Sequence, residues 1–220
     1  MFDRDAWPRI LPFALYMLFV FVADMAARAG LDEASLRYLY PLKIGVVLAA
    51  LLLLRRRYTE LSGSIGLREA ALALAAGVLV LVLWLHLDAG WMTLGQSSGY
   101  DPRGAGGAIS WPLAIVRLLG AALVVPVMEE LFWRSFLLRW IDAPDFMNTV
   151  HTKIKYRGFV VSVILFGIEH NLWFAGVVAG VVYSLLYMRR GNLWSAIVAH
   201  AVTNGLLGVF IIYTEQWTYW

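Results

Sequence analysis

The 220-residue sequence contains no cysteine and few charged residues. The absence of cysteine excludes disulfides, thiolate nucleophiles and thiolate metal sites. Charged residues make up 15% of the chain, hydrophobic residues make up 61%, and the mean hydropathy is +0.70. A soluble domain of this length is far less apolar, so the composition indicates an all-α, polytopic protein of the lipid bilayer. The net charge of +3 fits basic cytoplasmic loops, and no basic domain is available to bind nucleic acid.

Seven hydrophobic segments predict a bundle of about seven transmembrane helices in one membrane-embedded domain, residues 1–220. The predicted spans are 9–27, 36–54, 70–87, 111–138, 157–171, 174–188 and 193–213. Three fall in an N-terminal part, 1–110, and four in a C-terminal part, 111–213. The fifth and sixth are short for a hydrocarbon core that about 20 helical residues cross, so we expect them to meet inside the protein.

The distribution of basic residues predicts the orientation of the bundle. With a cytoplasmic N-terminus, the inner segments hold 12 of the 18 Lys and Arg residues and the outer segments hold three. This bias predicts the N-terminus inside and the C-terminus outside. Glu129 and His200 then lie about 15 Å and about 10 Å from the cytoplasmic ends of their spans. We therefore expect a cavity around them to open toward the cytoplasm.

The fourth span carries two adjacent acids, Glu129 and Glu130, followed by Arg134. Buried carboxylates cost several kcal/mol at bilayer depth, so they require a partner, a cavity or a function. Glu130 and Arg134 are four residues apart, the spacing that favours an ion pair. Glu129 points about 100° away and is predicted to be the free acid. Alternatively, all three residues form a buried charge cluster that only fixes helix packing.

Two later spans carry the other polar candidates. Phe166 precedes His170 by four residues, and His200 precedes Asn204 by four, so each pair shares a helix face. Either pair alone is typical of hydrogen bonding between helices. Three polar groups on three otherwise apolar spans together indicate a shared site.

These residue types are suited to the hydrolysis of a peptide bond. A carboxylate beside a neutral imidazole can take a proton from water, while a second histidine and an amide can donate to a developing oxyanion. Two imidazoles and a carboxylate, from His170, His200 and Glu129, are equally a zinc set with water as the fourth ligand. The sequence leaves open a glutamate mechanism that needs no cofactor and a mechanism that uses Zn²⁺. A His-Glu-x-x-His motif, an aspartyl pair and a glycine-flanked serine nucleophile are all missing from the spans.

Taken in order, Glu129-Glu130-x-x-x-Arg134, Phe166-x-x-x-His170 and His200-x-x-x-Asn204 resemble the three motifs of a known family. This is the CAAX-protease and bacteriocin-processing family of intramembrane proteases (CPBP, or Abi), which includes the type II CAAX prenyl endopeptidases. The resemblance covers residues 111–213. The segments around the motifs further resemble the bacterial branch of the family that is associated with exosortase and PEP-CTERM sorting. These segments are EELFWRSFLLRW, FGIEHNLWFAG and AHAVTNGLLG.

The resemblance implies a conical catalytic core from the last four spans, in a protein of the bacterial cytoplasmic membrane. It implies that Glu129 activates water with His200 as partner, and that His170 and Asn204 are oxyanion-side or metal-side groups. The implied supporting residues are Glu130, Arg134 and Phe166. The family is often described as metalloproteases, and a metal-free glutamate mechanism is also proposed for it.

The implied substrate is a membrane-anchored or hydrophobic peptide or protein, cleaved near the cytoplasmic side. A bacterial substrate is not expected to be prenylated. A non-proteolytic immunity or scaffold protein of the same fold, and a small transporter or proton pathway, remain as alternatives. The oligomeric state is not predicted.

Four residues outside the motifs have simpler interpretations. Arg117 and Lys43 lie near span ends, where their apolar stems allow the charges to snorkel to the interface. The sequence Gly176-x-x-x-Gly180 predicts a close contact between helices.

Overall fold

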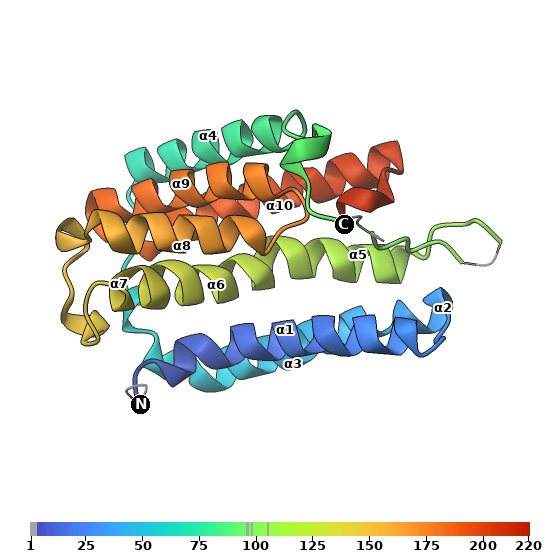
Figure 1. Ribbon diagram of the computed structural model, residues 1–220, viewed down its shortest axis with the longest axis horizontal. Helices are drawn as coiled ribbons and strands as arrows, with labels where there is room; N and C mark the ends of the chain where they lie inside the picture. The colour runs from blue at the N-terminus through green and yellow to red at the C-terminus, as the bar shows by residue number, and fades with distance from the viewer. Residues whose placement is uncertain (1–3, 96, 98, 105) are drawn as a thin grey trace.

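The computed structural model describes residues 4–95, 97, 99–104 and 106–220, which form a bundle of helices lying side by side (Figure 1). The α-helices are α1 (Trp7–Arg28), α2 (Glu33–Leu36), α3 (Leu39–Leu54), α4 (Leu67–Trp84), α5 (Trp111–Leu119), α6 (Val125–Glu130), α7 (Leu138–Trp140), α8 (Tyr156–Ile168), α9 (Trp173–Arg190) and α10 (Leu193–Thr214). Within these ranges there is no β-strand, so the predicted all-α class is confirmed.

The helices follow the seven predicted passes, with α5, α6 and α7 forming one continuous pass. Five stretches are long and apolar enough to cross a membrane: Trp7–Arg28, Glu33–Arg57, Leu67–Trp84, Trp111–Trp140 and Leu193–Thr214. The helix α8 has 13 residues and α9 has 18, and a short turn joins them. The predicted short pair is therefore present, and the turn that joins the two helices lies part-way along the bundle (Figure 1).

The surface of the bundle is apolar, as expected for contact with lipid. Phe21, Leu53 and Tyr213 expose 60%, 85% and 88% of their surface. Water would penalise this exposure, whereas hydrocarbon tails solvate it. Together with the spans, the surface identifies an integral, multi-pass membrane protein.

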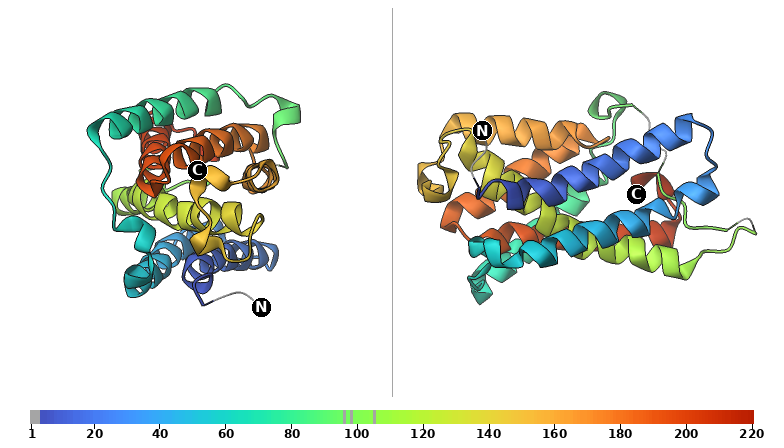
Figure 2. Two further views of the ribbon diagram at one scale, coloured as in Figure 1. Left: turned by 90° about the vertical axis from the view of Figure 1, so that its left-hand side faces the viewer. Right: turned by 90° about the horizontal axis from the view of Figure 1, so that it is seen from below.

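The bundle is arranged in layers around the long pass. The pair α1 and α3 covers one side of α5–α7, and α8, α9, α10 and α4 cover the other (Figures 1 and 2). The helix α10 packs against α4, α9 and α6, which places it at the centre of the upper layer. The two termini lie at opposite ends of the bundle, as an odd number of passes requires (Figure 1).

The long pass changes its winding on either side of the two glutamates. π-helical segments at Gly120–Val124 and Leu131–Leu137 flank α6, the short α-helix that ends at Glu130. Pro126 has no N–H to donate to the carbonyl of Ala122, four residues earlier, which favours the wider turn in the first π-segment. Such segments are frequent at functional sites, and here they flank the acidic pair.

Candidate active site

Glu130 is a buried carboxylate with two partners. Its Oε1 accepts a hydrogen bond from Arg134 Nη1 at 3.0 Å, so the ion pair predicted from spacing is present. His200 Nδ1 lies 2.9 Å from the same oxygen. The Arg134 side chain also donates to the carbonyl of Gly180 at 3.4 Å, which ties the long pass to α9. Glu130 and Arg134 are 0% and 1% exposed, so this pair is part of the interior.

Glu129 differs from its neighbour in having no cationic partner. Its Oε2 is buried without a hydrogen bond and lies 4.0 Å from His200 Nε2. The prediction of a free acid therefore agrees with the structure. His200 was expected to be the partner of Glu129, whereas the shorter contact of this histidine is with Glu130.

The contact with Glu130 fixes the tautomer of His200. A carboxylate that already pairs with Arg134 accepts the Nδ1–H of a neutral imidazole, because an ionised carboxylate has no proton to donate. The lone pair is then on Nε2, which faces Glu129. Glu130 thus orients His200, in the way that a buried carboxylate orients a catalytic imidazole.

Aromatic rings hold His200 in place. Tyr183 stacks on it with ring centres 4.9 Å apart and an interplanar angle of 19°. The Tyr183 hydroxyl donates to Thr203 Oγ1 at 2.8 Å. Phe166 meets His200 edge-on at 6.1 Å, and its ring lies 4.3 Å from Arg134 Cζ. Phe166 thus contacts both His200 and Arg134. Tyr183 was missed because no spacing connected it with the motifs, whereas Thr203 could have been found, since it lies three residues after His200 on the same helix face.

His170 lies in the turn that follows α8, not within the helix. Its Nδ1 lies 2.8 Å from the carbonyl oxygen of Phe166, to which it donates, so a neutral ring presents an unprotonated Nε2. Close packing of α8 and α9 brings this turn into the bundle. A Cβ on Gly176 would lie 3.0 Å from Gly167 Cα, which confirms the predicted helix contact at the first glycine of the Gly176-x-x-x-Gly180 pair.

A cavity of about 210 Å³ brings the four predicted catalytic residues together. Its lining includes Glu129, His170, His200 and Asn204, which come from α6, the α8–α9 turn and α10. The Asn204 amide donates to the carbonyl of Ala121 at 3.0 Å, in the first π-segment, and its second N–H is left for another acceptor. The three motifs, distant in the sequence, thus surround one space.

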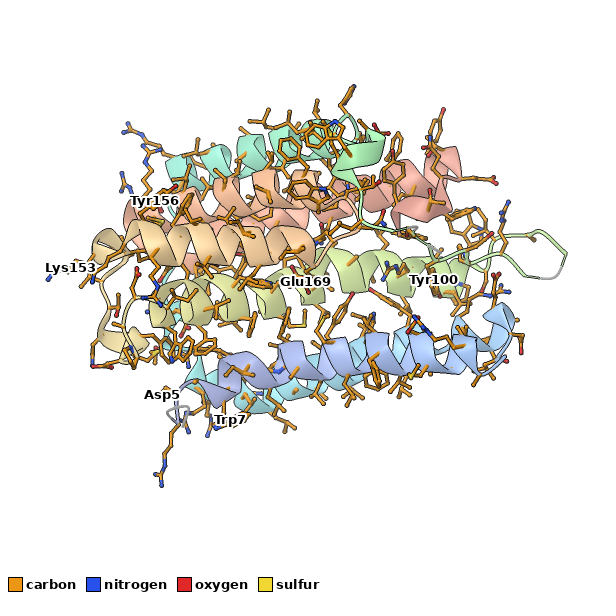
Figure 3. The ribbon with its side chains drawn as sticks, in the orientation of Figure 1. Asp5, Trp7, Tyr100, Lys153, Tyr156 and Glu169 are labelled. Atoms are coloured by element: carbon orange, nitrogen blue, oxygen red, sulfur yellow. The ribbon has the colours of Figure 1, made fainter. Side chains whose placement is uncertain are left out.

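Glu169 is an acid that the sequence reasoning did not assign to the site. It precedes His170 directly, and its Oε2 is buried without a hydrogen-bond partner. Figure 3 shows it near the middle of the bundle, between Lys153 and Tyr156 at one end and Tyr100 toward the other. The sequence contained a clue to this acid, because Glu169 and His170 are adjacent and combine a carboxylate with an imidazole, as Glu129 and His200 do.

Comparison with known proteins identifies the segment that carries this cavity. Residues 111–206 match the family model described as type II CAAX prenyl endopeptidase Rce1-like. This segment belongs to the Rce1-like family. The Rce1-like segment runs from α5 into α10 and contains all three motifs. The chain gives no significant match to a curated protein or to a solved structure. Membership supports an intramembrane peptidase of the CAAX type; the exosortase-associated branch stays a prediction.

The site in the Rce1-like segment is nearer to one end of the bundle. Glu129 lies eleven residues before the end of α7 at Trp140, and His200 lies seven residues after the start of α10 at Leu193. Both of these helix ends are on the side where the N-terminus lies (Figure 1). The depth inferred from the sequence is therefore consistent with the structure.

The cavity, however, extends toward the opposite end. Its lining continues to Trp84, Arg117, Tyr219 and Trp220, which are partly exposed and which we call the mouth. On the other side of Glu129 the long pass is closed by buried side chains, among them Leu131, Trp133, Phe136 and Leu138. The expectation that the cavity opens toward the N-terminal, cytoplasmic end is therefore wrong. The positions of the acids along their helix predicted their depth in the membrane, but only the packing of the side chains shows on which side of them a cavity remains.

The donor types in the Rce1-like segment suit zinc, but two of the candidate ligands lie farther apart in this structure than one zinc ion would hold them. His170 and His200 each present an Nε2 lone pair, and Glu129 is an unpaired carboxylate. Two ligands of one tetrahedral zinc lie roughly 3.3 Å apart, given bonds of about 2.0 Å, whereas Glu129 Oε2 and His200 Nε2 are 4.0 Å apart. Across the part of the chain that the structure describes, no three His, Asp or Glu residues are grouped closely enough to hold an ion.

Proposed function

We propose that the chain is an intramembrane endopeptidase that hydrolyses a peptide bond of a membrane-anchored or hydrophobic substrate with a water activated by Glu129 and His200. The observation that carries the proposal is the convergence of Glu129, His170, His200 and Asn204 on one cavity of about 210 Å³ inside an Rce1-like segment. Polar groups at such depth are costly unless they act together, and these types suit hydrolysis.

The gap between Glu129 and His200 accommodates the attacking water. A water about 2.8 Å from both Glu129 Oε2 and His200 Nε2 subtends an angle of roughly 90° across their 4.0 Å separation. Glu129 then takes one proton from the water as the oxygen attacks the substrate carbonyl. The same proton passes to the departing amine when the carbon–nitrogen bond breaks. Glu130 holds His200 in the tautomer that this arrangement needs.

The remaining polar groups of the cavity act on the substrate oxygen. The second N–H of Asn204 is a neutral donor to the developing oxyanion. His170 donates to it only as an imidazolium, because the Nδ1–H of a neutral ring is used by the Phe166 carbonyl. This makes Asn204 the principal oxyanion group and gives His170 a part that depends on its protonation.

The direction of the cavity determines how a substrate reaches the site. Its mouth lies at the end of the bundle that carries the C-terminus, which the charge bias places outside the cytoplasm. We infer that a peptide enters from the outer leaflet or from the space beyond it. This replaces the cytoplasmic entry expected from the sequence.

The test is cleavage of membrane-inserted peptides by purified protein in nanodiscs, followed by mass spectrometry. We expect Glu129→Ala and His200→Ala to abolish cleavage while the protein still inserts and folds. Glu33→Ala is the matched control, because Glu33 lies at the surface in α2. Cleavage by both cavity variants at the level of the unsubstituted protein would contradict the proposal.

Metal analysis of the same preparation separates the two mechanisms. The water mechanism requires cleavage to persist after chelation, with no stoichiometric metal in the active protein. Stoichiometric zinc, together with loss of cleavage on chelation and recovery on addition of zinc, would replace it with a metal mechanism at the same residues.

A further inference from the structure

Two cations lie beside the mouth of the cavity without an acid to neutralise them. Lys43 Nζ lies 3.9 Å from the ring centre of Tyr16 and 5.1 Å from that of Tyr40. Arg117 Cζ lies 4.3 Å from the Tyr40 ring centre, so both cations share this tyrosine. Among the described residues neither forms a salt bridge, and Arg117 Nε is buried without a hydrogen-bond partner.

Snorkelling does not account for Arg117. Its guanidinium is surrounded by aromatic rings, with Tyr100 at 5.5 Å and Trp220 at 6.0 Å in addition to Tyr40. By contrast Arg103, at the same end, pairs with Asp101 at 2.6 Å and with Glu215 at 3.3 Å. Acids are therefore available at this end of the bundle, and the chain uses none of them on Arg117.

A pair of like charges without a counter-charge in a low-dielectric region is unfavourable, and the aromatic faces and the neutral hydroxyls of Tyr16 and Tyr40 beside Arg117 offset only part of that cost. An anion bound between them removes both the desolvation penalty and the mutual repulsion. Because Arg117 lines the catalytic cavity, this anion lies in the same space as the scissile bond. The planar fork of arginine matches a carboxylate with two parallel hydrogen bonds.

Arg117 and Glu129 line the same cavity and lie on one continuous pass, twelve residues apart. A carboxylate held by Arg117 at the mouth therefore fixes the position of the substrate chain relative to Glu129.

We propose that Arg117, with Lys43 beside it, binds a carboxylate of the substrate at the mouth and thereby positions the scissile peptide bond at Glu129. The proposal rests on the endopeptidase function proposed above and specifies which substrates it accepts. The carboxylate is that of a free C-terminus or of an acidic side chain.

The test is a binding measurement that does not require cleavage. The protein carries Glu129→Gln in neutral phosphatidylcholine nanodiscs, and the probes are short apolar peptides labelled at the N-terminus. One peptide ends in a free carboxylate, a second ends in a carboxamide, and a third carries a carboxamide with one internal aspartate. Fluorescence anisotropy gives their dissociation constants.

We expect the free acid or the aspartate peptide to bind at least about tenfold more tightly than the neutral amide. Comparison of the two charged peptides identifies the source of the carboxylate. Arg117→Gln should remove the difference, and Arg117→Lys should restore part of it without the planar fork. Arg28→Gln is the control, because Arg28 is an exposed residue paired with Asp24.

Equal affinities for all three peptides, including no binding of any, would overturn the proposal. It would also be overturned if phosphatidylglycerol in the nanodiscs abolished the preference for the charged peptides, because the cations would then hold a lipid headgroup. A charge preference without cleavage by the unsubstituted protein would refute the endopeptidase function alone. Cleavage that ignores substrate charge would refute only the role of Arg117.

Discussion

Two groups of buried charged residues touch the long pass, and they differ in how completely their polar atoms are paired. The first, which we call the inner cluster, consists of Arg9, Glu60, Ser135 and Arg139 at the N-terminal end. Arg9 is 0% exposed and donates to Glu60 at 2.7 and 2.5 Å. Arg139 donates to Ser135 Oγ at 2.8 Å, and Ser135 in turn donates to Glu60. None of the recorded unpaired buried atoms belongs to this cluster.

The second group consists of cavity residues and their neighbours in sequence or contact, and several of its atoms lack partners. They are Oε2 of Glu129, Glu130 and Glu169, and Nε of Arg117 and Arg134. A buried polar atom without a hydrogen bond costs about 1–3 kcal/mol, so such atoms persist where something outside the static fold completes them. The comparison teaches that the fully paired charges of the inner cluster hold the bundle, whereas the two unpaired groups that line the cavity, Glu129 and Arg117, are available to water and substrate.

The largest expected effect separates the two adjacent glutamates. Glu129→Gln should lower the cleavage rate by about 10²–10⁴-fold, because it removes the proton acceptor. Its unfolding free energy should change by less than about 1 kcal/mol, since no hydrogen bond to Oε2 is lost. Cleavage assays and denaturant unfolding in detergent measure the two quantities.

Glu130→Gln is the matched variant. It leaves Arg134 and His200 buried without their carboxylate, so stability should fall by about 3–5 kcal/mol along with cleavage. If Glu129→Gln destabilised the protein as strongly as Glu130→Gln, the assignment of one free and one paired acid would be incorrect.

A second variant tests the inner cluster. Glu60→Gln leaves the fully buried Arg9 without its counter-charge and should lower the unfolding free energy by about 3 kcal/mol. Cleavage per folded molecule should remain at the level of the unsubstituted protein, because Glu60 does not line the cavity. Glu33→Gln at the surface is the control for the loss of one negative charge. Loss of cleavage with unchanged stability would show that the inner cluster is part of the active machinery.

The inner cluster should also respond to acid. Burial raises the pKa of Glu60, but hydrogen bonds from Arg9 and Ser135 and the Arg9 charge together hold it below its ordinary value of 4.5. A lowered folded-state pKa gives stability that is fully present above pH 4.5 and is lost as the pH falls through the folded-state pKa. We therefore expect thermal stability to decline below about pH 4.5, and to decline less steeply in Glu60→Gln. Identical slopes below that pH would exclude Glu60 as the source.

The sequence was sufficient for the passes and for the convergence of the motifs. Apolar runs located each pass to within a few residues, and the spacing of Glu130 and Arg134 predicted their ion pair. It was not sufficient for interactions that depend on rotation between helices. The contact of His200 with Glu130 depends on how α10 faces α6, and the stacking of Tyr183 on His200 depends on how α9 faces α10, which no periodicity records.

The direction of the cavity was missed for a related reason. Positions along each helix gave the depth of Glu129, but a cavity exists only where side chains fail to fill the space. The long pass is packed beyond Leu131 and open from Ala121 toward its start. Volume of this kind is a property of several helices together and leaves no pattern in any one of them.

The smallest expected effect concerns Tyr183, whose ring stacks on the cavity residue His200 and whose hydroxyl forms a hydrogen bond within the scaffold, to Thr203. Tyr183→Phe removes its hydrogen bond to Thr203 but keeps the ring that stacks on His200. Thr203 Oγ1 still lies 2.9 Å from the carbonyl of Gly77, so its proton keeps an acceptor and stability should fall by only about 1 kcal/mol. Cleavage should be nearly unchanged, whereas Tyr183→Leu should reduce it by releasing the imidazole. If Tyr183→Phe alone abolished cleavage in folded protein, the hydroxyl would belong with the unpaired cavity groups and not with the scaffold.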